Sequence, residues 1–143
     1  LFAAKKVGPK GRVLAIDLVQ TETAFPPQVT FMQADLLEPD EALINAIQAR
    51  QPFDLVLSDM APQTTGIKIR DQARSVELAR IALHWGQEVL APGGNLVVKV
   101  FQGPDVPDFL KEMRAVFGKV KNFKPKSSRT ESPEVFVLGF GRK

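Results

Sequence analysis

The fold of this chain is decided by the stretch Phe53-Asp54-Leu55-Val56-Leu57-Ser58-Asp59-Met60-Ala61-Pro62. Its first five residues are a mainly hydrophobic run that predicts a buried β-strand, and a helical pattern begins near Asp71. Asp59 is therefore expected where a parallel strand ends and its loop begins. In open α/β sheets, ligands and catalytic groups gather at such strand ends.

A second apolar strand is predicted at residues 96–100, and it contains Lys99. A lysine inside an apolar strand is costly unless it is paired or has a function. Because Asp59 ends one strand and Lys99 lies in the next, we interpret them as a candidate catalytic pair.

Strands and helices alternate along the rest of the chain, which is typical of an α/β fold with a mainly parallel sheet and helices on both faces. No helix is predicted between the last two strands, so they should form an antiparallel hairpin. We expect a single domain over residues 1–143. The predicted strands are residues 12–17, 29–33, 53–58, 96–100, 119–123 and 134–140, and the predicted helices are 40–50, 71–90 and 104–117.

Composition limits the function classes. With 143 residues and 44% hydrophobic residues, the chain can form one ordinary core. There is no cysteine, which excludes disulfides and thiolate metal sites, and we expect no metal. No apolar segment approaches the length of a membrane helix. These points favour the cytoplasm, or an organelle if a transit peptide has been removed, and a protein that does not enter a membrane. We also expect a monomer.

Charge is distributed unevenly behind a net value of +3. Residues 1–12 carry four basic groups and no acid, residues 13–110 have a net charge of −7, and residues 111–143 have a net charge of +6. Basic ends around an acidic middle favour a polyanionic partner that docks beside a carboxylate site. The alternative is a solvated lysine-rich surface. The candidate nucleic-acid contacts are Lys119, Lys121, Lys124, Lys126 and Arg129.

Three acids end successive predicted strands: Asp17, Asp35 and Asp59. A strand-terminal acid such as Asp17 can accept hydrogen bonds from ribose hydroxyls, as in dinucleotide folds. Asp35 could accept from an adenine amino group. Any one of them could be an ordinary loop acid, but three in register predict an adenosine-containing cofactor across the strand ends.

The aromatic residues are interpreted mainly as core rather than as groups that stack on bases. This applies to Trp85, Phe31, Phe53, Phe117 and Phe136. Phe101 and Phe123 are also assigned to the core, but the preference over base stacking is smaller for them. His84 lies in the middle of a predicted helix and is interpreted as structural.

The whole chain resembles the FtsJ-like ribosomal RNA ribose 2′-O-methyltransferases, a branch of the Rossmann-like enzymes that use S-adenosylmethionine. The Ser-Asp-Met-Ala-Pro and Val-Lys-Val-Phe-Gln-Gly motifs are together highly specific, whereas the Pro-Gly-Gly turn is generic among methyltransferases. The matching segments are residues 8–18, 57–62, 90–94, 97–103 and 126–136.

The resemblance implies methyl transfer from S-adenosylmethionine to a uridine ribose 2′-hydroxyl in large-subunit ribosomal RNA. It implies that Asp59, Lys99 and Glu134 are three members of a Lys-Asp-Lys-Glu catalytic tetrad. It also implies that Asp17 and Asp35 hold the ribose and adenine of the cofactor, with Asp59 near its methionine end. Burial would lower the pKa of Lys99 and the two carboxylates would raise it, so the residues leave open whether Lys99 is a base or a charged group.

The sequence departs from the family pattern at its start. The first tetrad lysine and the first strand with its glycine-rich loop are not found, so we expect an N-terminally truncated methyltransferase with a gap beside residues 12–17 or 53–58. Two alternatives remain: a methyltransferase with another substrate, and a non-catalytic module that binds RNA or the ribosome. The missing Gly-x-Gly-x-x-Gly fingerprint disfavours a dinucleotide oxidoreductase.

Overall fold

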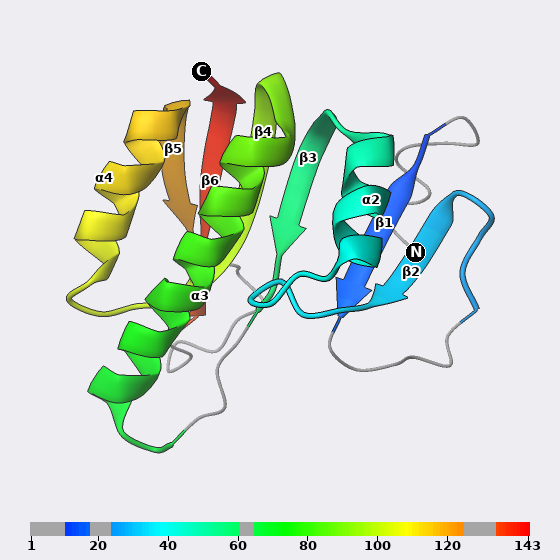
Figure 1. Ribbon diagram of the computed structural model, residues 1–143. Helices are drawn as coiled ribbons and strands as arrows, with labels where there is room; N and C mark the ends of the chain where they lie inside the picture. Colours follow the sequence, from blue (N-terminus) through cyan, green and yellow to red (C-terminus); the bar gives the residue numbers. More distant parts are fainter. Residues whose placement is uncertain (1–10, 18–23, 61–64, 125–133) are drawn as a thin grey trace. The chain divides into compact units, whose positions relative to one another are not determined.

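The order of elements in the computed structural model is β1 (Val13–Asp17), β2 (Val29–Gln33), α2 (Glu41–Arg50), β3 (Phe53–Ser58), α3 (Lys68–Val89), β4 (Leu90–Phe101), α4 (Val106–Val116), β5 (Phe117–Phe123) and β6 (Glu134–Arg142) (Figure 1). The structure describes residues 11–17, 24–60, 65–124 and 134–143. These elements divide between two compact units, Leu1–Arg50 and Gln51–Lys143. The expectation of a single domain stays a prediction.

The first unit contains a parallel pair, β1 and β2, and the helix α2. The register of the pair runs from Val13 opposite Val29 to Asp17 opposite Gln33, so both strands end at one edge. Helix α2 starts after Asp40, whose Oδ1 accepts a hydrogen bond from the Leu43 backbone N–H at 2.8 Å. That bond satisfies one of the amides that a helix start leaves without a partner.

The second unit is a four-stranded sheet in the order β3-β4-β6-β5. The pair β3/β4 is parallel, whereas β4/β6 and β5/β6 are antiparallel. The predicted C-terminal hairpin is therefore confirmed, and β6 is inserted between β4 and β5. Helices α3 and α4 cover the same face of this sheet (Figure 1).

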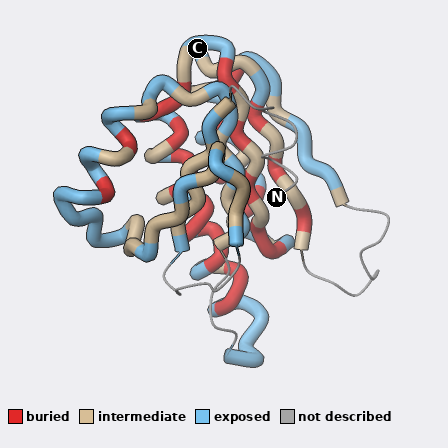
Figure 2. The backbone as a smooth tube through the Cα atoms, turned by 90° about the vertical axis from the view of Figure 1, so that its right-hand side faces the viewer, coloured by how far each residue is buried: buried red, intermediate tan, exposed pale blue. Residues whose placement is uncertain are grey.

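The core of the second unit lies between that sheet face and the two helices. Alternate residues of β4 and β6 point into it, including Leu96, Val98 and Val137, and each is at most 1% exposed. From the helices come Phe109 and Val76, which are 0% and 1% exposed. Because one side of each helix faces this core, buried and exposed positions alternate along the helices (Figure 2).

Strand β3 corrects one expectation. Its apolar run predicted a buried strand, yet Leu55 is 47% and Leu57 is 60% exposed. Among the described residues β3 is an edge strand, and of its side chains Phe53 and Val56 pack against the core. Leu55 and Leu57 point to the face opposite the helices.

The described strands form two separate sheets, and the expected gap beside residues 12–17 or 53–58 stays a prediction. Among the described residues, β1 pairs only with β2, and β3 pairs only with β4. Element bounds differ from prediction by a few residues. Helix α3 begins at Lys68 rather than Asp71, β4 already begins at Leu90, and β5 includes Phe117, which was predicted to end a helix.

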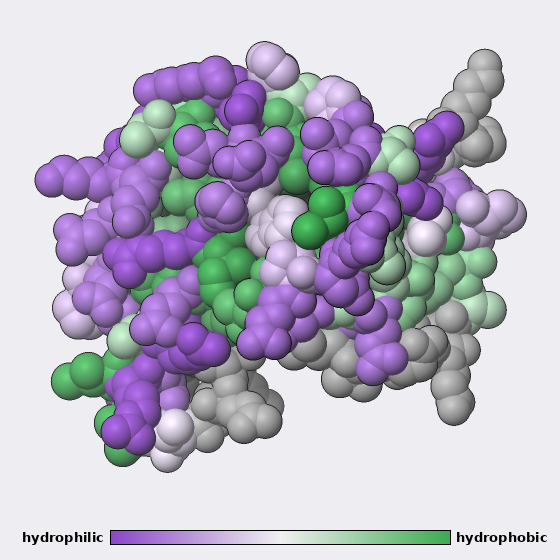
Figure 3. Space-filling model, in the orientation of Figure 1, coloured by the Kyte–Doolittle hydropathy of each residue, from purple (hydrophilic) through white to green (hydrophobic). Residues whose placement is uncertain are grey.

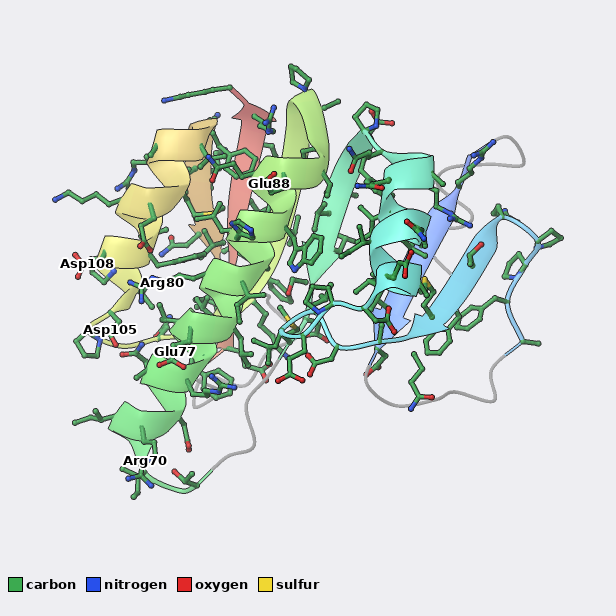
Figure 4. All side chains as sticks on the ribbon, in the orientation of Figure 1. Arg70, Glu77, Arg80, Glu88, Asp105 and Asp108 are labelled. Carbon is green, nitrogen blue, oxygen red and sulfur yellow. The ribbon has the colours of Figure 1, made fainter. Side chains whose placement is uncertain are left out.

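The outer side of α3 and α4 is charged, and the two helices are joined across it by Arg80 Nε and Glu112 Oε2 at 2.8 Å. The space-filling view shows hydrophilic side chains over both helices (Figure 3), and Figure 4 labels four of the charged residues that lie along α3: Arg70, Glu77, Arg80 and Glu88. Both partners of the Arg80–Glu112 pair are 44% exposed, so it contributes at most about 1 kcal/mol.

The first turns of α3 hold two loops through buried polar side chains. The Asp71 carboxylate accepts hydrogen bonds from the backbone N–H and the hydroxyl of Thr65, both at 2.8 Å. The Ser75 hydroxyl, 1% exposed, accepts from the Phe101 backbone N–H at 2.8 Å. Asp71 thereby fixes the end of the loop after β3, and Ser75 fixes the end of β4.

We expect Ser75→Ala to lower the free energy of unfolding by about 1–3 kcal/mol, because it leaves the buried Phe101 N–H without its acceptor. Urea unfolding measures this. The control is Glu77→Ala on the exposed side of the same helix, which should change stability by no more than about 0.5 kcal/mol. Equal stability of the Ser75→Ala and Glu77→Ala variants would contradict this account.

We expect Asp71→Asn to weaken the pH dependence of stability. The backbone N–H and then the hydroxyl of Thr65 lower the pKa of Asp71 below its ordinary 3.8, and they outweigh the opposing effect of burial. The charged carboxylate therefore stabilises the folded state above the ordinary value, and this contribution disappears as pH falls through the lowered pKa. Unfolding curves between about pH 5 and pH 2 should be flatter for the variant, and curves parallel to the wild type would refute the assignment.

Candidate active site

Three charged side chains meet at the edge of the four-stranded sheet where β3 and β4 end. The Lys99 Nζ lies 2.6 Å from Asp59 Oδ1 and 3.5 Å from Glu134 Oε1. The lysine side chain is only 13% exposed, whereas those of Asp59 and Glu134 are 78% and 45% exposed. The site is thus a partly buried cation held by two carboxylates that reach solvent.

Strand register delivers these residues to one point. Ser58 of β3 lies opposite Val98 of β4, so Asp59, the next residue, comes beside Lys99. Strand β6 is antiparallel to β4 and begins with Glu134 opposite Phe101. Its start therefore lies at the end of β4, and it brings the second carboxylate to the lysine.

The electrostatics favour the charged form of Lys99. Burial by itself lowers the pKa of this lysine, but the hydrogen bond and charge of Asp59 and the charge of Glu134 outweigh burial and raise the pKa above its ordinary 10.5. The two carboxylates therefore favour the ammonium form of Lys99 over the neutral amine.

An ammonium has three N–H donors and no acceptor. Two of them are directed by Asp59 and Glu134, and a third can donate to an oxygen that approaches from solvent. A hydroxyl placed there would be oriented by Lys99, and negative charge that develops on its oxygen would be stabilised. The arrangement suits a reaction in which a neutral oxygen becomes a nucleophile.

The two other predicted acids lie in the first unit, at one edge of the β1/β2 pair. Asp17 is exposed at the end of β1, and its carbonyl accepts from the Ala34 N–H at 2.9 Å. Asp35, partly buried, directly follows Ala34, and its Oδ1 accepts from the Leu37 N–H at 2.9 Å. The structure thus brings Asp17 and Asp35 to the same edge, while the expected common edge with Asp59 stays a prediction.

The predicted RNA contacts fall partly on β5. Lys119 and Lys121 are exposed on this strand, whereas Lys126 and Arg129 lie outside the described residues. Lys124 Nζ donates to the Glu134 carbonyl at 3.3 Å, so it supports the strand that carries a site carboxylate. Sequence reasoning missed this role, because only the pairing of β5 with β6 brings the two residues together.

The aromatic assignments divide. Phe101 and Phe117 are 8% and 1% exposed and belong to the buried core, as expected. His84 is exposed on its helix. Phe123 is 54% exposed, so its interpretation as core is wrong. The reason is that it is the last residue of β5, an edge strand, on the face that α3 and α4 leave uncovered.

Within the described part of the chain, no helix has both the length and the apolar character needed to cross a membrane.

A family description, FtsJ-like methyltransferase, matches residues 2–142. Among curated proteins, the ribosomal RNA large subunit methyltransferase E of Oleidesulfovibrio alaskensis is 54% identical over 143 residues, which are 100% of this chain and 69% of the relative. The protein of the same name from Lawsonia intracellularis is 43% identical over 143 residues, or 100% of this chain and 72% of the relative.

Solved structures agree on the fold. A ribosomal RNA methyltransferase from Plasmodium falciparum superimposes with a TM-score of 0.79 at 24% identity, covering 93% of this chain and 73% of that one. A methyltransferase from Streptococcus mutans in complex with SAH gives a TM-score of 0.52 at 17% identity, covering 91% and 71%. The Rossmann-like methyltransferase fold expected from the sequence is confirmed.

The site geometry thus occurs in a chain that the family description matches over residues 2–142 and that is 54% identical over its full length to a curated relative. This chain belongs to the FtsJ-like methyltransferase family.

Proposed function

We propose that this protein transfers a methyl group from S-adenosylmethionine to the 2′-hydroxyl of a uridine ribose in large-subunit ribosomal RNA. The observation that carries the proposal is the Lys99 ammonium, held 2.6 Å from Asp59 and 3.5 Å from Glu134 at the strand ends. The names of the curated relatives support the substrate class. We also propose that the protein acts as a monomer in the cytoplasm.

The residues present fit the cofactor. Asp17 stands exposed at the end of β1, where a carboxylate can accept from the two hydroxyls of a ribose. Asp35 has Oδ1 turned to its own loop at the same edge, and Oδ2 can accept from an adenine amino group. When bound, S-adenosylmethionine supplies an electrophilic methyl carbon. Asp59 would lie at the methionine end.

Lys99 and its two partners act on the hydroxyl. The Lys99 ammonium donates to the 2′-oxygen and stabilises the negative charge that develops on this oxygen as the hydroxyl proton leaves. Asp59, whose side chain is 78% exposed, can accept the hydroxyl proton and pass it to water. Glu134 keeps the ammonium in place and keeps it charged. Lys99 is therefore an orienting and charge-stabilising group rather than the general base.

We expect Lys99→Ala to lower the single-turnover rate of RNA methylation by about 10²–10⁴-fold. Affinity for S-adenosylmethionine should stay within about twofold, because Lys99 acts on the hydroxyl. Asp59→Ala should reduce both quantities, and Glu134→Ala should reduce the rate less than Lys99→Ala does. The measurement is transfer of labelled methyl to a ribosomal RNA fragment at saturating cofactor.

Lys99→Arg separates the two roles of the lysine. Arginine keeps the charge but cannot act as a base, because it does not lose its proton in proteins. It should retain more activity than Lys99→Ala, although its larger head will not restore the full rate. Lys111→Ala, on the solvent side of α4, is the matched control and should be fully active. An RNA whose target uridine lacks the 2′-hydroxyl should accept no methyl, and methylation of that RNA would place the reaction at another atom.

RNA affinity should fall steeply with salt, because phosphates neutralised by lysines release counterions. Simultaneous replacement of Lys121, Lys124, Lys126 and Arg129 by alanine should reduce the slope of log affinity against log salt by about 3 for single-stranded RNA. The control carries the same loss of charge on the helical face, at Arg74, Arg80, Lys111 and Arg114. A larger change of slope in the control would move the RNA surface to the helices.

A further inference from the structure

An exposed phenylalanine lies near the candidate active site, on the sheet face that α3 and α4 leave uncovered. Phe123 is the last residue of β5 and is 54% exposed. A single exposed apolar residue is common on protein surfaces. Phe123, however, lies on the same sheet face as Lys99, at the side where β4 ends and β6 begins. Its neighbours therefore indicate whether it has a function.

Cross-strand register places Phe123 in one row with Lys99. Lys99 of β4 lies opposite Phe136 of β6, and Phe136 lies opposite Phe123 of β5. Residues directly opposite in antiparallel strands point to the same face and contact each other. Two strand spacings, about 10 Å, therefore separate Phe123 from Lys99. That span matches the reach from a ribose to the base of a neighbouring nucleotide.

The same face of β5 is basic. Lys119 and Lys121 alternate with the inward residues and so point to the side of Phe123, and both are exposed. Aromatic rings beside lysines are the combination that binds single-stranded RNA, because a ring stacks on a base while the ammonium groups meet the phosphates.

We propose that Phe123 is a stacking platform for the base next to the target uridine, and that it helps to select an unpaired RNA segment. This inference rests on the proposed function and adds a subsite to it. The alternative occupant is an apolar protein surface. RNA is favoured because Lys119 and Lys121 precede the ring along β5 and can meet phosphates. Across the strands from the ring lies Lys99, where a ribose is to be placed.

The test uses short single-stranded RNAs that contain the target uridine and carry 2-aminopurine as its 5′ or its 3′ neighbour. Fluorescence of 2-aminopurine is quenched on stacking. Wild-type protein should quench at least one of the two probes, and Phe123→Trp should quench it as strongly or more. Phe123→Leu should abolish quenching and weaken binding at least fivefold, because leucine keeps the apolar contact but has no ring to stack.

The matched control is Phe140→Leu, because Phe140 is a partly exposed aromatic on the same face, opposite Lys119 and far from the row of Lys99. It should quench and bind as the wild type does. If Phe123→Leu quenches and binds as the wild type does while the wild type methylates RNA, the stacking proposal is wrong and the proposed function stands. A wild-type protein that neither binds nor methylates RNA overturns both. A change in sedimentation of Phe123→Leu with unchanged RNA binding would assign the ring to a protein interface and also overturn the proposal.

Discussion

The register of β4 against its two neighbours is the constraint on which the second unit depends. With β3 parallel on one side and β6 antiparallel on the other, β4 is paired along both edges, and helix α3 packs against one of its faces. Its alternate residues therefore divide into a buried series and a series that includes Lys99. A shift of one residue would exchange these two series, expose the core and bury the lysine among valines. Packing of the core and placement of the active lysine are thus the same requirement.

The charge state of Lys99 follows from that placement. A lysine buried alone would lose its proton, but here strands on both sides contribute a carboxylate, and their effect outweighs burial. The cost of keeping a cation partly out of water is offset by two directed hydrogen-bonding partners. The site therefore presents a positive charge beside the exposed carboxylate of Asp59, which suits the proton transfer that we propose.

Rigidity around the site comes from the start of α3 rather than from the site itself. Asp71 accepts hydrogen bonds from Thr65, just before α3, and Ser75 accepts one from the last amide of β4, so α3 fixes the end of the strand that carries Lys99. Gln72 adds to this, because Gly103 passes so close to its side chain that a Cβ there would lie 2.2 Å from it. The hydrogen bonds that order this region are thus made by α3, and the exposed carboxylates of the site stay accessible to solvent.

The sequence by itself determined the alternation of strands and helices and the final hairpin, because periodicity is a local property of the chain. It also predicted that Asp59 and Lys99 form a pair, and the resemblance to a family added Glu134. Only the tertiary structure decided what depends on a partner distant in sequence. Insertion of β6 between β4 and β5 brings Glu134 to Lys99 and Lys124 to the Glu134 carbonyl. The exposure of Leu57 on β3 likewise follows from an edge position that no local pattern reveals. An apolar strand is buried only where another element covers its face, and that cover is assembled from segments far apart in the chain.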